Sequence, residues 1–326
     1  MQAFNKKCVV LYSGGLDSLL ACAIMHSMNF EIFPLFVQTP FYKKDTQHLQ
    51  NQLNLFSLKL NTIRNDMEYI DVIKNPQFGY GKNINPCIDC KIFFYKQAKL
   101  FMEKTDASFI VTGEVLGQRP MSQRSYSILR NIEKRANLID MVLRPLSAKC
   151  LPETAMEKEG IVDREKLFCI TGRARKEQFE LAKHFNITDF ESPAGGCLLT
   201  DKSISIRIKE ILKKEIISKE EIELLSIGRH FKINNNHFIV SRKKDETLLL
   251  INRFKDNLPS IRCHQAPGAV GVFVDEPTEQ EIDLGGAIIK HYSKKTEYVA
   301  YEYNEKDYIF KPKDIDIKTL EQLMIK

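Results

Sequence analysis

Residues 12–18 read Tyr12-Ser13-Gly14-Gly15-Leu16-Asp17-Ser18, and this stretch decides the fold. It follows an apolar run at 8–11, which we expect to be a buried strand, and precedes 19–25, which we expect to be a helix. A Ser/Gly turn between a strand and a helix start is a phosphate-binding arrangement. Glycines let the backbone approach an anion, and the free N–H groups of the helix start point toward it. Ser13 and Ser18 add hydroxyl donors, and we expect Asp17 to orient the loop or to help hold a magnesium ion.

Two common nucleotide loops do not fit this stretch. There is no G-x-x-x-x-G-K-[ST], because no Lys follows the second glycine, and there is no G-x-G-x-x-G. The pattern S-G-G-x-D-S resembles the PP-loop of the ATP pyrophosphatase superfamily. This resemblance implies an enzyme that cleaves ATP between the α and β phosphates and adenylates a substrate oxygen. The residues implied to bind ATP here are Ser13, Gly14, Gly15, Asp17 and Ser18. The competing explanation is an ordinary Gly-rich turn, which the strand–turn–helix context disfavours.

The first half of the chain alternates strand-like with helix-like segments. We expect strands at 31–38, 58–64, 108–112 and 137–143, and helices at 42–58, 92–104 and 122–132. This alternation predicts an α/β domain with a parallel, doubly wound, Rossmann-like sheet. The PP-loop resemblance implies the same class, that of the adenine nucleotide alpha hydrolases. Ligands of such sheets bind beyond the carboxyl ends of the strands, where the loops at Ser13 and Gly113 both lie.

The second part of the chain has a different pattern. After an expected helix at 204–212, short apolar segments at 237–241, 247–251, 271–274, 287–292, 298–303 and 308–310 are separated by polar turns. We interpret them as strands of a smaller, β-rich α+β domain. The predicted domains are therefore 1–200, which includes Cys197, and 201–326. From Lys202 to Arg262 there are 14 Lys/Arg against eight Asp/Glu. That excess fits an RNA-binding face, or simply a solvated basic surface.

Composition narrows the protein class. The chain has 326 residues, 43% of them hydrophobic, and a formal net charge of +6. No apolar run approaches the ~20 residues of a membrane span, and the start lacks the apolar core of a signal peptide, so we expect a cytoplasmic protein. Eight cysteines in a reducing compartment argue against a disulfide scaffold. We expect Cys8, Cys22 and Cys169 to pack as small hydrophobic residues.

Three other cysteines form a candidate reactive group. Cys87 and Cys90 form a C-x-x-C at the start of a helix, where thiol pKa values are lowered, and Cys197 lies in a Gly/Pro loop at 192–200. Three thiolates without a fourth partner would leave one iron of a [4Fe–4S] cluster open to a non-protein ligand. They could equally form an open zinc site or carry sulfur as a persulfide. The alternative is that the pair and the remote cysteine are unrelated.

A further block points to one family. Residues 110–118 read Ile-Val-Thr-Gly-Glu-Val-Leu-Gly-Gln, followed by Ser122-Gln123 and by Leu143-Arg144-Pro145-Leu146. The block resembles the T-G-E-x-L-G-Q…S-Q…L-R-P-L signature of the tRNA 4-thiouridine synthase family. The resemblance implies that Gly113, Glu114 and Gln118 close the opposite side of the nucleotide pocket. Arg119-Pro120 makes one spacing a residue longer, and no rhodanese-like domain is evident, so the modified uridine and ring position stay open.

The hypothesis is a tRNA sulfurtransferase that adenylates a uridine carbonyl oxygen with ATP and replaces it with sulfur. The expected catalytic residues are Asp17, Cys87, Cys90 and Cys197, with ATP, magnesium and a [4Fe–4S] cluster on the three thiols; zinc or a persulfide alone are the alternatives. The expected partners are tRNA and a cysteine desulfurase or another sulfur donor. We expect no membrane association, and the chain could form a homodimer. We expect Arg164, Arg173 and Arg175 to contact RNA phosphates. The rivals are a PP-loop ligase or amidotransferase-like enzyme that adenylates a small molecule, and a non-catalytic RNA-binding iron–sulfur module.

Overall fold

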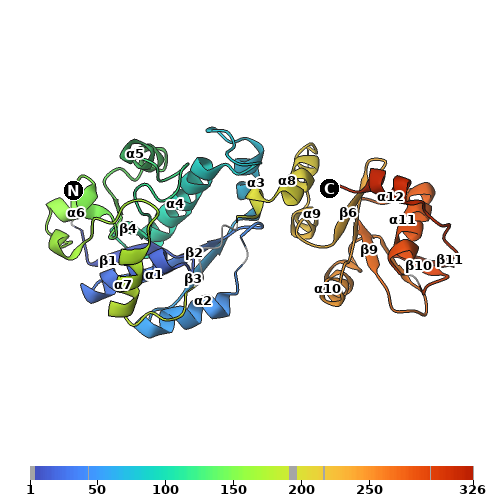
Figure 1. Cartoon of the computed structure of the whole chain (residues 1–326), viewed down its shortest axis with the longest axis horizontal. Coiled ribbons are helices and arrows are strands. Elements are labelled where there is room, and N and C mark those ends of the chain that lie inside the picture. The colour runs from blue at the N-terminus through green and yellow to red at the C-terminus, as the bar shows by residue number, and fades with distance from the viewer. Residues whose placement is uncertain (1–3, 43, 191–196, 216, 294, 326) are drawn as a thin grey trace. The chain divides into compact units, whose positions relative to one another are not determined.

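The protein forms two compact units, Met1–Cys197 and Leu198–Lys326, each built around its own sheet. The computed structural model (Figure 1) describes residues 4–42, 44–190, 197–215, 217–293 and 295–325. The division lies close to the boundary expected after residue 200. Both units have the expected class, because the first holds a parallel sheet and the second an antiparallel one.

The first sheet has five strands in the order β3-β2-β1-β4-β5, all parallel. This is the doubly wound order, with β1 at the centre and the chain running outward to either side. The strands are β1 (Lys7–Leu11), β2 (Glu31–Gln38), β3 (Asn61–Arg64), β4 (Phe109–Thr112) and β5 (Val142–Leu143). The strand predicted at 137–143 is therefore reduced to its last two residues.

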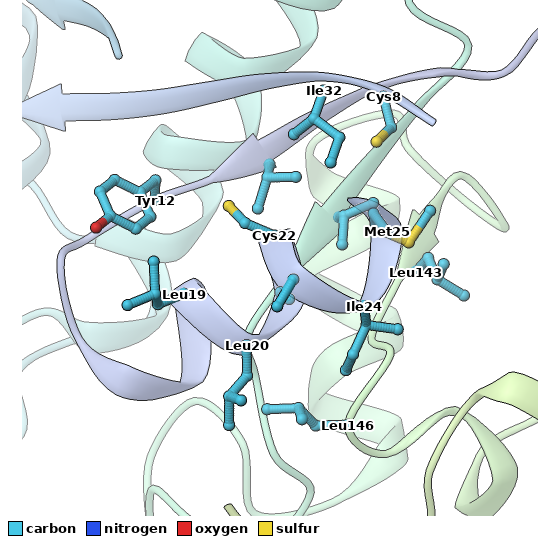
Figure 2. Packing of buried hydrophobic residues seen from close by; sticks show 14 of the residues in the cluster. Cys8, Tyr12, Leu19, Leu20, Cys22, Ile24, Met25, Ile32, Leu143 and Leu146 are labelled. Atoms are coloured by element: carbon cyan, nitrogen blue, oxygen red, sulfur yellow. The ribbon is translucent and has the colours of Figure 1, made fainter. Parts of the chain in front are cut away.

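Helices cover both faces of this sheet. They are α1 (Leu16–Ser27), α2 (Thr46–Leu53), α3 (Asp66–Lys74), α4 (Cys87–Lys104), α5 (Tyr126–Arg135), α6 (Ala155–Lys158) and α7 (Lys176–His184). Cys8 and Val10 of β1 face α1, and Figure 2 shows Cys22, Leu19 and other α1 side chains packed there. Helix α4 contacts β1, β2 and β4 and shares no residue with that core, so it lies on the other face. The sequence did not reveal α3.

The second sheet has six antiparallel strands in the order β11-β10-β8-β9-β7-β6. The strands are β6 (Arg229–Ile233), β7 (Asn236–Val240), β8 (Ser260–Cys263), β9 (Val270–Phe273), β10 (Val299–Tyr303) and β11 (Lys306–Phe310). The helices are α8 (Lys202–Ile211), α9 (Lys219–Leu224), α10 (Lys244–Phe254), α11 (Glu279–Tyr292) and α12 (Ile317–Leu323). Separate cores on the two faces, one holding Phe238 and the other Ile239, bury both sides of β7.

Two strand predictions in the second unit were wrong. Residues 247–251 lie in helix α10, in which Glu246, Leu250 and Phe254 are buried at helical spacing while Leu248 and Leu249 are exposed. Residues 287–292 end helix α11, which starts at a capping box of Thr278 and Glu281. Tertiary packing and the helix cap outweighed the local β propensity of these apolar runs.

The cysteine predictions were partly wrong. Cys8 and Cys22 are fully buried among apolar side chains, as expected (Figure 2). Cys169 does not pack as a hydrophobic residue: it is exposed and forms a disulfide with Cys150, across Cα atoms 5.0 Å apart. The two cysteines meet because Phe168 and Ile170 pair through backbone hydrogen bonds with the segment 145–149. Among the described helices, none combines the length and the hydropathy that crossing a bilayer requires.

Candidate active site

The predicted phosphate loop joins β1 to α1 and is held closed by its own serines. Ser18 donates a hydrogen bond to the carbonyl of Gly15 at 2.8 Å and accepts one from the N–H of Ser13 at 3.2 Å. Gly14 has φ +74°, and a Cβ there would overlap the side chain of Leu49. The loop therefore needs glycine at this position, and the first turn of α1 presents its unbonded N–H groups beyond it.

The Gly113 loop lies directly on the first turn of α1. A Cβ on Gly113 would overlap the backbone carbonyl group of Asp17, so the backbones touch because glycine has no side chain. The loop is also held from behind, since the N–H of Leu116 donates to the hydroxyl of Ser147 at 3.0 Å. The structure thus brings together the two blocks that the sequence placed at the carboxyl edge of the sheet.

Asp17 receives two further contacts from outside its loop. The amide of Gln118 donates to its carboxylate at 3.0 Å, and the guanidinium of Arg175 lies 3.6 Å from it. Asp17 Oδ1 and the Nε and Nη1 atoms of Arg175 are buried without a hydrogen-bond partner among the described residues. An unsatisfied buried guanidinium beside a phosphate loop is a donor set that suits an anion. Arg175, expected to contact RNA, therefore lies at the nucleotide loop instead.

Glu114 does not face the nucleotide loop, although the sequence analysis placed it there. Its carboxylate is 3% exposed and accepts a hydrogen bond from Tyr95, with Arg144 at 3.1 Å and Lys91 at 3.1 Å. Burial would raise the pKa of Glu114, but the charges of Lys91 and Arg144 outweigh it and lower the pKa to about 2. Arg144 also pairs with Glu133 at 2.6 Å. The carboxylate is thus committed to a buried ionic network that ties α4 to the loop after β4.

The three candidate thiols lie near one another in the first unit. Cys87 and Cys90 occupy the first turn of α4, and Cys197 is the last residue of the unit. The charges of Cys197 and Cys87 both act on the pKa of Cys90, which places the three within electrostatic range. Cys90 Sγ is 3.1 Å from the hydroxyl of Tyr69, a residue that the sequence analysis missed. Gly195 and Gly196, predicted to turn this loop, lie outside the described residues.

The thiol pKa values differ from the expectation. Burial raises the pKa of Cys90 to about 12, and the neighbouring charges of Cys197 and Cys87 add to the rise. Burial also raises the pKa of Cys87, although Arg119 and Lys91 oppose it. At both positions, desolvation raises the thiol pKa more than the helix N-terminus lowers it. The lowered thiol pKa predicted from the sequence was therefore wrong.

Tyr42 joins the two halves of the site. Its hydroxyl donates to the carbonyl of Ser13 at 3.1 Å, so it touches the phosphate loop. The charges of Arg119 and Cys197 both act on the pKa of the same hydroxyl, which burial raises. Tyr42 therefore contacts the predicted phosphate loop and lies within electrostatic range of Cys197. No local pattern marks Tyr42, because its role depends on how β2 and β1 pair.

The three thiols have the chemistry of metal ligands but are not arranged as a metal site. No group of three His, Cys, Asp or Glu side chains in the described part of the chain, these cysteines included, is placed to hold a metal ion. Thiolates are nonetheless the soft ligands that iron–sulfur clusters and zinc bind. Arg164, expected to contact RNA, instead pairs with Glu157 and donates to the carbonyl of Leu151 at 2.9 Å. Arg173 is exposed.

Comparisons with known proteins match a different family on each side of the boundary between the two units. The family described as thiamine biosynthesis protein (ThiI) matches residues 3–166, half of the chain. The family described as NFACT protein RNA binding domain matches residues 228–324, within the second unit.

Individual relatives are distant. A probable tRNA sulfurtransferase from Methanosarcina mazei is 29% identical over 116 residues, which covers 34% of this chain and 29% of that protein. Another from Methanosarcina acetivorans is 30% identical over 114 residues, covering 34% of this chain and 28% of that protein. The matches thus span less than a third of the length of either curated relative. A crystal structure of a 4-thiouridine synthetase in complex with RNA and ATP covers 56% of this chain and 51% of that chain, at 19% identity and a TM-score of 0.36.

Proposed function

This chain belongs to the family described as thiamine biosynthesis protein (ThiI), and on that premise we propose that it is an ATP-dependent tRNA sulfurtransferase. In the proposed reaction, a uridine carbonyl oxygen of tRNA is adenylated and then replaced with sulfur. The observation that carries the proposal is Tyr42, which bonds the phosphate loop at Ser13 and lies within electrostatic range of Cys197. A nucleotide loop beside a group of thiols is what a reaction that couples ATP cleavage to sulfur transfer requires.

The nucleotide step uses the loop, Gln118 and Arg175. The uridine oxygen attacks the α phosphorus of ATP, the bond to the bridging oxygen breaks, and pyrophosphate leaves. The N–H groups at the start of α1 and the buried guanidinium of Arg175 would stabilise the negative charge that develops. Asp17 Oδ1, buried and without a hydrogen-bond partner among the described residues, is suited to help hold magnesium, which neutralises phosphate charge. Gln118 orients that carboxylate.

The pKa of Cys90 favours a ligand role for this thiol. Because burial raises its pKa to about 12, the free Cys90 thiol is protonated at neutral pH and is a poor nucleophile. A bound metal supplies the positive charge that removes the proton. We therefore propose that Cys87, Cys90 and Cys197 hold a [4Fe–4S] cluster. When bound, such a cluster supplies one iron with an open coordination position, at which sulfide can bind.

The residues around the thiols would place the incoming base. Sulfide attacks the uridine carbon that carries the adenylated oxygen; the new C–S bond replaces the C–O bond, and AMP leaves with that oxygen. Arg119, whose charge lowers the pKa of Cys87, is suited to receive the departing phosphate because it acts on both Cys87 and Tyr42. The buried network at Glu114 would keep α4, and with it the two cysteines, in register with the nucleotide loop.

We also propose that the second unit binds the tRNA. The match to an RNA-binding domain over residues 228–324 supports this, as does the excess of Lys and Arg from Lys202 to Arg262. A cysteine desulfurase or another source of sulfide would supply the sulfur. The small-molecule ligase and the non-catalytic iron–sulfur module remain as rivals, and the experiments below separate them.

The function is tested by nucleoside mass spectrometry of tRNA from a strain that lacks the protein. We expect one thionucleoside to disappear and to return with the wild-type chain but not with Asp17→Ala. An unchanged set of thionucleosides would remove the tRNA claim. ATP–pyrophosphate exchange without any RNA would favour the small-molecule ligase. Unimpaired function of Asp17→Ala would favour the non-catalytic module.

The thiol site is tested by iron and sulfide analysis of anaerobically purified protein. We expect about four irons per chain in the wild type and loss of both the iron and the thiolation in Cys197→Ala. Cys263→Ala is the matched control, since Cys263 is a buried cysteine of the second unit. Thiolation that persists in a protein free of iron would support the persulfide route instead. Stoichiometric zinc would support the zinc site.

A further inference from the structure

The second unit contains a pocket of about 390 Å³ between the end of α8, the β6–β7 hairpin and the turn after β9. Its size is in the range of small-ligand sites. Lys213, Lys214, Lys232 and Asn235 lie on its wall together with two carboxylates, Glu210 and Asp275. His237 also lines the pocket, although it is only 7% exposed. Every one of these residues belongs to the second unit, so the pocket is complete within it.

A relay of two buried histidines fixes the chemistry of His237. His230 Nε2 is 2.7 Å from the carbonyl of Ile227, and His230 Nδ1 is 2.8 Å from His237 Nε2. A carbonyl only accepts, so His230 carries its proton on Nε2. Burial lowers the pKa of both histidines, to about 4 for His237, so both rings are neutral at pH 7. His230 Nδ1 must then accept, and His237 Nε2 must donate to it.

The consequence is an acceptor with a fixed orientation. With its proton on Nε2, neutral His237 has a lone pair on Nδ1. Among the described residues, none forms a hydrogen bond with Nδ1 of His237. This nitrogen is also not one of the fully buried polar atoms that lack a partner. The relay therefore offers one hydrogen-bond acceptor to whatever enters the pocket. A fully deprotonated anion such as sulfate, which has only acceptors, is the wrong ligand for it.

Two lysines of the pocket favour a ligand that carries a negative charge. Lys232 lies 3.0 Å from Glu210, and Lys213 pairs with the same carboxylate. Their side chains are 48% and 66% exposed, and ion pairs of such exposed groups contribute only about 0–1 kcal/mol. The two ammonium groups can therefore turn to an incoming phosphate at little cost. A ligand that combines a phosphate with a hydrogen-bond donor fits both features.

We propose that this pocket binds one nucleotide of the RNA, with a donor on His237 Nδ1 and the flanking phosphate on Lys213 and Lys232. The donor is a ribose 2′-hydroxyl or a base N–H. Exposed Asn235 is available to the base edge. The inference rests on the proposed function, because it takes RNA as the substrate, and it adds the place where the RNA is recognised.

The test compares RNA binding by full-length variants using fluorescence anisotropy. His237→Gln is designed to retain the relay, because the Gln amide can replace the Nε2–H donor while the Nδ1 acceptor is lost. Lys232→Met removes one phosphate contact. Lys306→Met is the matched control, since Lys306 is 69% exposed and pairs with Glu276 in the same unit, outside the pocket. The probes are an unmodified tRNA transcript and a single-stranded RNA and DNA of one sequence.

We expect His237→Gln to weaken tRNA binding about tenfold and Lys232→Met to lower the slope of log affinity against log salt by about one, with Lys306→Met like the wild type. A tenfold loss on RNA but not on DNA identifies the 2′-hydroxyl, and an equal loss on both identifies a base N–H. Wild-type binding by both pocket variants would overturn the proposal, and Lys232→Met keeps it testable if His237→Gln unfolds. A wild-type chain that binds tRNA but forms no thionucleoside would instead refute the proposed function.

Discussion

The guanidinium of Arg175 lies 3.6 Å from the carboxylate of Asp17, two residues that stand at opposite ends of the first unit's sequence. The contact forms because Gly172 donates a backbone hydrogen bond to Leu116 at 2.7 Å, which brings the start of α7 to the nucleotide loop. The proposed nucleotide site is therefore built from three separate segments of the chain, and Arg175 brings to it two buried nitrogen atoms, Nε and Nη1, that lack hydrogen-bond partners among the described residues.

Replacing Arg175 tests whether that cation serves ATP. We expect Arg175→Met to lower kcat/KM for RNA-dependent ATP–pyrophosphate exchange by about ten- to a hundredfold, since a hydrogen bond to a charged group contributes about 1.5–3 kcal/mol. Lys183→Met is the matched control, because Lys183 is an exposed cation of the adjoining helix α7. Equal exchange rates in the two variants would contradict the assignment.

The contact between Gly113 and the backbone of Asp17 predicts a steric effect. Gly113→Ala should lower the free energy of unfolding by about 1–3 kcal/mol, because the added methyl group overlaps backbone atoms that cannot move aside. In Gly81→Ala the new Cβ would meet its nearest atom at 3.4 Å, an ordinary contact. Urea unfolding of both variants measures the difference, and a Gly113→Ala protein as stable as Gly81→Ala would refute the close approach.

The buried network at Glu114 predicts a large loss of stability on removing its cation. Arg144→Met leaves Glu114 and Glu133 buried without their main partner, and removing one member of such a pair costs about 3–5 kcal/mol. Arg130→Met is the control, since Arg130 is 34% exposed and should contribute less than about 1 kcal/mol. The measurement is chemical unfolding at neutral pH. Similar losses in the two variants would show that the network is not a structural centre.

The Cys150–Cys169 disulfide closes a loop with a sequence separation of 19 residues. In the chain-entropy account, a loop of this length contributes about 3 kcal/mol. We expect a reductant to lower the thermal midpoint of the wild-type protein and to leave Cys150→Ser unchanged, because that variant already lacks the bond. A midpoint of the wild type that does not respond to reductant would mean that the two thiols are not joined in the purified protein.

The two buried histidines predict a dependence of stability on pH. The pKa of His237 falls from 6.5 to about 4, chiefly through burial and then through the charges of Lys214 and Arg207. Between those values the unfolded chain binds a proton that the folded chain does not. Stability is therefore full above about pH 6.5 and falls with pH toward 4, by about 1.4 kcal/mol per unit for this histidine. Thermal unfolding of His237→Gln should show a shallower decline between pH 7 and pH 5; an identical decline would place the titration elsewhere.

Sequence reasoning succeeded where a local pattern carries the chemistry. The phosphate loop, the C-x-x-C at a helix start and the Gly113 loop are all short motifs, and the structure places each at the carboxyl edge of the sheet. Sequence reasoning failed for residues that reach the candidate site only through tertiary packing. Tyr42, Tyr69 and Arg175 belong to the site only because strands and helices distant in sequence pack together.

Glu114 shows a second kind of limit. A signature can place a carboxylate beside a nucleotide loop, but it does not say which way the side chain points. Here the half-buried Lys91 and the buried Arg144 draw it inward. In the second unit, apolar runs such as that in α10 fit a strand or a buried helix equally well until the burial of every fourth residue is known.

The network of Tyr95, Glu114, Glu133 and Arg144 has an evolutionary consequence. Each member is buried, and each would leave an unsatisfied partner if it changed alone. Substitutions at these four positions should therefore be inherited together, so an apolar residue in place of Arg144 should be accompanied by neutral residues at Glu114 and Glu133. An alignment of related sequences would then show the four positions co-varying as a block, although four separate segments of the chain supply them.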